Sequence, residues 1–316
     1  MKQQDMRIVF MGTPKFSVTI LEGILRANYK VVGVITAPDR PAGRGQKIHE
    51  SAVKLFSKSK NLNILQPTNL KDETFLSNLK DLNANLQVVV AFRMLPKEVW
   101  KMPSLGTFNL HASLLPNYRG AAPINWVIIN GEKSSGVTTF FIDENIDTGA
   151  IILQSKLRID PSENAGSLHD KLMKLGEKLV IKTIKQIELC SVETHKQSTK
   201  GLKTAHKLNK ENCKINWNSC SESIYNKVRG LSPYPAAWGL LSNGNELLNI
   251  KIYEVKKYFE KHNFQIGQLL TTKKTIKIAV IDGYVELINF RFPGKRQMDT
   301  PSFLNGFTFH ENAKML

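Results

Sequence analysis

One stretch of the chain predicts the fold: Phe108-Asn109-Leu110-His111-Ala112-Ser113-Leu114-Leu115-Pro116. Successive side chains of a β-strand point to opposite faces, so Asn109 and His111 share one face. Proline lacks the N–H group that a strand ladder requires, and Pro116 therefore marks the change from strand to loop. Polar side chains at the carboxyl end of a strand are typical of open α/β sheets, which bind their ligands there.

A second polar loop, Asp143–Gly149, follows an apolar run at Val137–Ile142 that predicts another strand. In this loop Asp147 is a candidate partner for His111, because a carboxylate beside an imidazole fixes the tautomer and raises the basicity of the ring. A histidine on a strand is most often structural, and Asp-Thr-Gly is common in plain turns. The presence of Asn109, His111 and Asp147 together favours a catalytic site.

The N-terminal half alternates strands with helices. Arg7–Met11 predict a strand that ends in a turn at Gly12, and the following apolar residues, from Phe16 to Leu25, have helical spacing. Val31–Ile35 and Leu86–Ala91 are further strands. The pattern predicts a Rossmann-like, doubly wound α/β sheet. The first turn has one glycine instead of the G-x-G-x-x-G fingerprint, which argues against a nicotinamide or flavin dinucleotide site.

The composition limits the class of protein. Of the 316 residues 41% are hydrophobic, as is usual for globular proteins. No apolar run reaches the ~18 residues of a membrane span, and the start of the chain lacks a signal-peptide pattern. The three cysteines and seven histidines show no metal-site spacing. We therefore expect a cytoplasmic protein without a metal or a membrane contact, and nothing in the sequence requires more than a monomer.

The charge is strongly positive, with a formal net charge of +17. Residues 1–170 carry 20 Lys and Arg against 15 Asp and Glu, whereas residues 171–316 carry 24 against 12. The excess in the second half favours a polyanionic partner such as nucleic acid. A proteome that is rich in lysine throughout is the alternative explanation.

The composition and the hydrophobic pattern of the chain change after residue 189. Residues 190–208 are polar and weakly patterned, which predicts a linker. Beyond them, short strands at Leu247–Tyr253, Thr275–Val280 and Tyr284–Ile288 are separated by Gly or Asn turns. This spacing predicts a small OB-like β-barrel. The expected domains are 1–189, Rossmann-like and catalytic, then the linker 190–208, and 209–316, the barrel.

Three motifs resemble the folate-dependent formyltransferase family: Asn109-x-His111-x-Ser113-Leu114-Leu115-Pro116, Arg119-Gly120 and Asp147-Thr148-Gly149. The resemblance runs from Met11-Gly12-Thr13-Pro14 to Phe307. Two departures stand out. The loop after Ala91 is one residue shorter than the commoner form in the family, and Asn145 stands where the family has glycine. Asparagine tolerates left-handed backbone geometry, so the replacement at Asn145 is a mild departure.

The resemblance implies a set of site residues. The catalytic residues would be Asn109, His111 and Asp147. Contacts to the folate would come from two loops, which contain Ser113, Leu114, Leu115 and Pro116, and Phe92, Arg93 and Met94. A long basic loop, expected over residues 36–47, would contact tRNA through Arg40, Arg44 and Lys47.

The resemblance also implies the function. A formyl group would pass from 10-formyltetrahydrofolate to the amino group of methionyl initiator tRNA, in support of translation initiation. One alternative is a formyltransferase or formyl-folate hydrolase that acts on a small molecule. A non-catalytic RNA-binding protein is an alternative of another class. The basic loop and the basic second half favour tRNA over a small molecule, while Asn109, His111 and Asp147 favour an enzyme.

Overall fold

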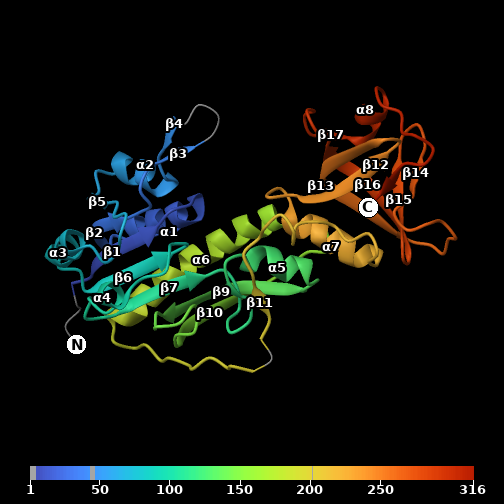
Figure 1. Ribbon diagram of the computed structural model, residues 1–316. Coiled ribbons are helices and arrows are strands. Elements are labelled where there is room, and N and C mark those ends of the chain that lie inside the picture. The colour runs from blue at the N-terminus through green and yellow to red at the C-terminus, as the bar shows by residue number, and fades with distance from the viewer. Residues whose placement is uncertain (1–4, 43–46, 201) are drawn as a thin grey trace. The chain divides into compact units, whose positions relative to one another are not determined.

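The computed structural model describes residues 5–42, 47–200 and 202–316 (Figure 1). The chain forms two compact units, each built from more than one segment. The first unit contains the chain up to Gly120 and the segments Ser135–Leu157 and Asp170–Thr204. The second unit contains Ala121–Ser134, Arg158–His169 and the chain from Ala205 on.

The first unit has a seven-stranded sheet with the order β10-β9-β7-β6-β1-β2-β5. Its strands are β1 Arg7–Gly12, β2 Lys30–Ile35, β5 Ile64–Leu65, β6 Leu86–Val90, β7 Thr107–His111, β9 Ser134–Phe141 and β10 Ile151–Arg158. Neighbours from β7 to β5 pair in parallel, and β9 pairs antiparallel with β7. The predicted doubly wound sheet is therefore confirmed, with a mixed edge.

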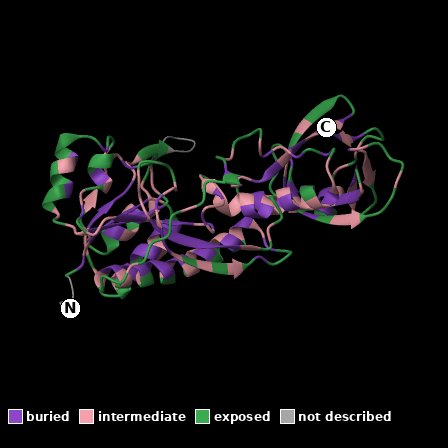
Figure 2. Ribbon diagram, turned by 90° about the horizontal axis from the view of Figure 1, so that it is seen from below, coloured by how far each residue is buried: buried purple, intermediate pink, exposed green. Residues whose placement is uncertain are grey.

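Helices pack against both faces of this sheet. They are α1 Lys15–Arg26, α2 Ala52–Ser59, α3 Glu73–Asp81, α4 Lys97–Trp100 and α6 Ala165–Glu188. Of α6, the part from Asp170 on belongs to this unit. Alternation along β1 sends Val9 and Met11 into a core with Phe75 of α3, where all three are buried. On α6, Gly176 lies against Leu110 of β7 and Ile20 of α1, which identifies the opposite face. Figure 2 shows the strands largely buried between these layers.

The strand order reverses between β1 and β6, and this is the point where open α/β sheets bind ligands at the carboxyl ends of their strands. The turn after Gly12, the loop after Val90 and the loop after His111 all begin at that edge, because these strands run parallel. The topology therefore gathers the predicted site loops at one edge of the sheet.

Residues 36–47 were expected to form a long exposed loop, and the absence of strands in that expectation is wrong. Two short strands, β3 Arg40–Ala42 and β4 Lys47–His49, pair as an antiparallel hairpin. Residues 43–46, with Arg44, lie outside the described part of the chain. The base of the hairpin is held by Asp39, which binds Lys54 of α2 and accepts a hydrogen bond from Gln66.

The second unit is an antiparallel sheet with the order β14-β15-β16-β13-β12-β18, with β17 added to β16. Its elements are α5 Pro123–Ile129, α7 Ser221–Leu231, β12 Ala237–Asn243, β13 Glu246–Phe259, β14 Leu269–Thr271, β15 Ile276–Val280, β16 Gly283–Arg291, β17 Met298–Asp299, α8 Thr300–Leu304 and β18 Lys314–Met315. The short strands β8 Arg119–Gly120 and β11 Thr204–Ala205 complete the chain. The strands form the expected OB-like barrel.

The barrel closes because its two edge strands meet. Gln268, just before β14, forms an antiparallel bridge to Lys314 of β18, and Met315 N donates to the Gly267 carbonyl over 2.8 Å. Gly267 has φ +85°, and a Cβ atom there would lie 2.2 Å from the Met315 carbonyl oxygen. Only glycine permits this approach of two backbones.

An aromatic cluster fills one end of the barrel. Phe303 is 2% exposed, and its ring centroid lies 4.3 Å from that of Phe292, 4.7 Å from Phe307 and 5.0 Å from Phe290. We expect the Phe303→Ala variant to lose about 3–5 kcal/mol of unfolding free energy, because truncation leaves a cavity among these rings. Urea denaturation followed by tryptophan fluorescence measures the loss. A loss below about 1 kcal/mol would show that the cluster collapses around the cavity.

Residues 191–200 lie extended along the first unit, where the sequence predicted a linker. His195 pairs with Ile151 of β10 through backbone hydrogen bonds of 2.8 and 2.9 Å. The proposed division at residues 190–208 into separate domains remains a prediction. No helix in the described part of the chain is long and apolar enough to cross a membrane.

Candidate active site

Asn109 and His111 lie on β7, which pairs with β6 on one side and with β9 on the other. Hydrogen bonds on both sides hold the strand rigidly and fix the direction of these two side chains. Asn109 is half-buried, and its amide has no hydrogen-bond partner among the described residues. A half-buried amide without a partner is an available donor for a ligand.

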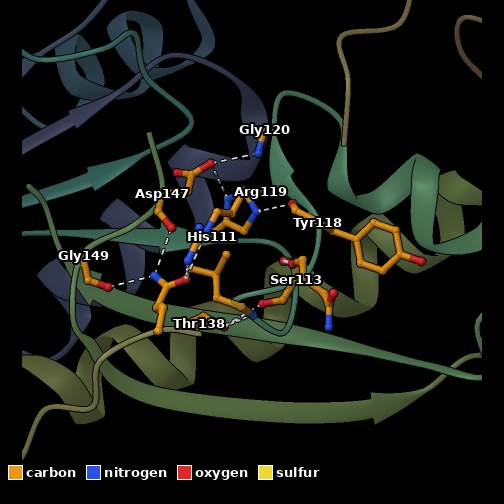
Figure 3. A network of polar contacts seen from close by, with 11 residues as sticks. His111, Ser113, Tyr118, Arg119, Gly120, Thr138, Asp147 and Gly149 are labelled. Carbon is orange, nitrogen blue, oxygen red and sulfur yellow. Dashed lines mark hydrogen bonds and ion pairs between the residues drawn. The ribbon is translucent and has the colours of Figure 1, made fainter. Parts of the chain in front are cut away.

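His111 is buried, and its two ring nitrogens face different groups (Figure 3). Nε2 lies 2.8 Å from the carbonyl oxygen of Tyr118, and since a carbonyl only accepts, Nε2 carries the hydrogen. Nδ1 faces Oδ2 of Asp147 at 3.7 Å, which is longer than a hydrogen bond. In the neutral ring, Nδ1 therefore presents a lone pair beside a carboxylate. Such a pair is arranged to receive a proton or a cationic N–H group.

Asp147 lies in a loop whose shape is fixed by its own residues. Asp143 Oδ1 accepts hydrogen bonds from Asn145 N and from Thr148 Oγ1, at 3.0 and 2.7 Å. A Cβ atom on Gly149 would lie 1.7 Å from the Phe141 carbonyl oxygen, so the turn requires glycine there. Oδ2 of Asp147 accepts from the backbone N–H of Gly120 over 3.0 Å. The loop thus delivers the carboxylate to His111.

The left-handed residue of this loop is Asp147, with φ +56°, and not Asn145. The tolerance of asparagine for left-handed geometry is therefore not used at position 145. Aspartate reaches this conformation more readily than most residues do. The departure at Asn145 therefore leaves the backbone of the loop undisturbed.

The loop Ser113–Pro116 packs beside His111 and is internally braced. Thr138 Oγ1 donates to the Ser113 carbonyl over 2.7 Å, and Gln154 Nε2 donates to the Leu115 carbonyl over 2.7 Å. The Ser113 hydroxyl is buried and donates to the Asn117 carbonyl, so it braces the loop from within. Leu115 is also buried. A folate contact from this loop consequently rests on its backbone and on its partly buried positions, Leu114 and Pro116.

The second predicted folate loop follows β6. Phe92 packs against the core beneath the sheet, whereas Met94 is 66% exposed. The Arg93 guanidinium donates to the carbonyls of Pro67 and Thr68. Burial, with a smaller effect from nearby Arg40, lowers the pKa of Arg93 from its ordinary value. The structure therefore uses Arg93 and Phe92 to hold the loop and leaves Met94 exposed.

The predicted tRNA contacts are described only in part. Arg40 lies at the start of the hairpin, opposite His49. The backbone of Lys47 belongs to β4, its side chain is not described, and Arg44 lies outside the described residues.

The described residues contain no group of three or more His, Cys, Asp or Glu side chains that would hold a metal ion. What the site offers is a neutral amide donor on Asn109, the imidazole of His111 and the carboxylate of Asp147. A donor for a developing oxyanion next to a proton acceptor suits acyl transfer to an amine.

Comparison with known proteins agrees with this chemistry. Residues 6–184 match the formyl transferase family, and residues 207–308 match the formyl transferase C-terminal domain. The chain belongs to the formyl transferase family. Formyl transferases of this family draw on folate-derived formyl donors, and the family's two regions together span nearly the whole chain.

Relatives in the formyl transferase family cover the chain from end to end. A methionyl-tRNA formyltransferase of Flavobacterium johnsoniae is 61% identical over 99% of both chains. That of Flavobacterium psychrophilum is 57% identical over 98% of both. Among solved structures, the sugar 3N-formyl transferase WlaRD, in the presence of dTDP and 5-N-formyl-THF, has a TM-score of 0.65 at 24% identity. It covers 93% of this chain and 100% of its own. The last comparison supports the fold.

Sequence reasoning missed three residues that support the formyl transferase site. The carbonyl of Tyr118 orients His111, Thr138 braces the 113–116 loop, and Gln197 binds the Asp147 loop. The alternation of side chains along the predicted strand places Thr138 on its inward face, so the sequence could have indicated this residue. Tyr118 acts through its backbone and Gln197 comes from a polar segment, so neither carried a signal in the sequence.

Proposed function

We propose that this protein transfers a formyl group from 10-formyltetrahydrofolate to the amino group of methionyl initiator tRNA. The proposal rests on the pair of His111 and Asp147, with Asn109 two residues before His111 on β7, in a chain whose full-length relatives bear the name methionyl-tRNA formyltransferase. The protein acts in the cytoplasm, as a monomer, in support of translation initiation.

The reaction forms a C–N bond between the amine and the formyl carbon and breaks the bond from that carbon to N10 of the folate. Asn109 donates a hydrogen bond to the formyl oxygen as it becomes negative. The proton released by the amine passes to the pair formed by His111 and Asp147, whose facing atoms Nδ1 and Oδ2 both accept. N10 takes up a proton as it leaves, so the charges balance.

The folate fits the edge of the sheet in chemical terms. The apolar side chains of Leu114 and Pro116 are partly exposed there, and Met94 is 66% exposed on the neighbouring loop. A flat heterocycle is held by apolar surfaces together with a few polar backbone groups, as in most small-molecule sites. These three side chains and the backbone of residues 92–95 therefore contact the folate.

The second unit and the hairpin bind the tRNA. Within the second unit, residues 205–316 carry 16 Lys and Arg against 9 Asp and Glu. In the first unit the proposed tRNA contacts are Arg40, Arg44 and Lys47. Since these contacts are made to phosphates, we expect the KM for charged tRNA to rise about tenfold or more between 50 and 200 mM salt. Steady-state kinetics at several salt concentrations measure this, with the KM for the folate as the internal control. A KM for tRNA that is independent of salt would contradict phosphate binding.

The decisive experiment is a formyl-transfer assay with purified protein and 10-formyltetrahydrofolate. Methionyl initiator tRNA is compared with uncharged tRNA, glycinamide ribonucleotide and a dTDP-linked amino sugar. Formylation of the charged tRNA alone is the expected result. Formylation of a small amine would show a small-molecule formyltransferase, and consumption of the folate without an acceptor would show a hydrolase. Binding of tRNA without any turnover would support the RNA-binding alternative.

A further inference from the structure

The segment 191–200, which carries no predicted function, places one side chain beside the Asp147 loop. Gln197 lies two residues beyond the backbone bridge between His195 and Ile151. Its Nε2 donates to the carbonyl oxygens of Asp147 and Gly149, at 2.9 and 2.8 Å. These two carbonyls lie on either side of Thr148, and a single amide group therefore holds the carboxyl end of the loop.

The other half of the Gln197 amide is also engaged. Its Oε1 accepts from Nη2 and Nε of Arg119, at 2.7 and 3.1 Å. Both protons and the oxygen of the amide thus have partners, which fixes the orientation of the group. Arg119 in turn donates to the Ser198 carbonyl over 3.3 Å. Gln197 and Arg119 consequently hold each other in place.

These contacts form one hydrogen-bond network that includes His111 and Asp147. Asp147 Oδ2 accepts from the N–H of Gly120, next to Arg119, and the carbonyl of Tyr118 accepts from His111 (Figure 3). Residues 118–120 therefore hold His111 by a carbonyl and the Asp147 carboxylate by an N–H. Gln197 ties the backbone of Asp147 to the same segment through Arg119.

The backbone conformation of Asp147 explains why this network is needed. With φ +56°, Asp147 adopts a conformation that residues other than glycine rarely reach. Such a conformation persists only where the surroundings enforce it. The amide of Gln197 supplies that restraint from outside the loop, whereas Asp143 supplies it from within.

We infer that Gln197, together with Arg119, is a positioning residue for the catalytic pair His111 and Asp147. It touches no reacting atom, and it acts by holding the Asp147 carboxylate opposite Nδ1 of His111. The inference rests on the roles proposed above for His111 and Asp147. It assigns to the segment 191–200 a part in catalysis as well as in connecting the chain.

The test is the Gln197→Met variant, which keeps the length of the side chain and removes its hydrogen bonds. We expect kcat for formyl transfer to methionyl-tRNA to fall about 10- to 100-fold, because a small displacement of a catalytic group is costly. The KM values for folate and tRNA stay within about twofold, since binding groups are untouched. Gln186→Met on α6 makes the same change where the side chain has no hydrogen-bond partner among the described residues, and it keeps the wild-type rate.

Two further variants separate positioning from a loss of folding. Gln197→Glu keeps the acceptor for Arg119 and loses both donors to the loop, so it too loses kcat. Arg119→Met combined with Gln197→Met is expected to be about as slow as the slower single variant, because both belong to one network. Unfolding midpoints measured in parallel report the folded fraction.

Three results would overturn the inference: a wild-type kcat in Gln197→Met, a loss that matches the unfolded fraction, or losses that add in the double variant. A wild-type protein that leaves charged tRNA unformylated would refute the proposed acceptor instead. The same variants are then compared in whichever reaction the wild type performs, formyl transfer to another amine or formyl-folate hydrolysis. The expected fall in kcat is again about 10- to 100-fold.

Discussion

The Asn109→Ala variant is expected to lose about 10²–10³ in kcat while it remains folded, as is typical when one oxyanion donor is removed. The reason lies in the setting of the side chain. Asn109 is half-buried on a strand that is paired on both sides, and its amide has no partner among the described residues. It is therefore aligned before substrate binds. Truncation removes more stabilisation from the transition state than from the folded protein.

Single-turnover kinetics with saturating folate and methionyl-tRNA measure this loss, and the unfolding midpoint confirms the fold. Asn109→Asp is a second variant of nearly the same size, in which an acceptor replaces the donor. We expect it to be at least as slow, because a carboxylate repels the developing oxyanion. Asn63→Ala, at an exposed asparagine before β5, is the matched control and keeps its rate. Near-normal turnover in Asn109→Ala would remove Asn109 from the mechanism.

The Asp147→Asn variant is expected to lose about 10²–10⁴ in kcat, the usual contribution of a positioned proton acceptor. Asparagine has the same size and tolerates left-handed geometry, so the backbone at φ +56° is retained. Its carbonyl oxygen still accepts from Gly120 N. What disappears is the negative charge 3.7 Å from Nδ1 of His111, and with it one of the two groups that accept the proton of the amine.

The alanine variant provides the comparison. Asp147→Ala removes the charge and also places a residue that disfavours positive φ at a left-handed position, so it should lose stability as well as rate. Thermal unfolding separates the two effects, because Asp147→Asn should unfold near the wild-type midpoint. If Asp147→Asn turned over at the wild-type rate, the charge would have no role in the reaction.

Local sequence patterns predicted the central strands well. β1, β2, β6 and β7 lie within one or two residues of their expected positions, because each is a short apolar run between turn residues. Asp72 caps α3 by accepting a hydrogen bond from Phe75 N. α4 was missed, since four residues are too few to establish a helical period.

The least predictable parts were those stabilised by partners far away in the chain. The hairpin of β3 and β4 was expected to be a long exposed loop without strands, because its prolines and glycines are as common in loops as in turns. Residues 191–200 have no periodic pattern, yet they are ordered by contacts with β10 and with the Asp147 loop. Polar hydrogen bonds of this kind leave no hydrophobic signature.

By itself, the sequence determined the strand that carries Asn109 and His111, the glycine turn that follows Asp147, and the basic second half. Each of these depends on residue type and on spacing along the chain. Only the tertiary structure decided that Nε2 of His111 carries its hydrogen, that Asp147 is the left-handed residue, and that Gln197 holds it. These features arise because a hydrogen bond depends on distance in space, and the partners of Asp147 lie 27 and 50 residues away along the chain.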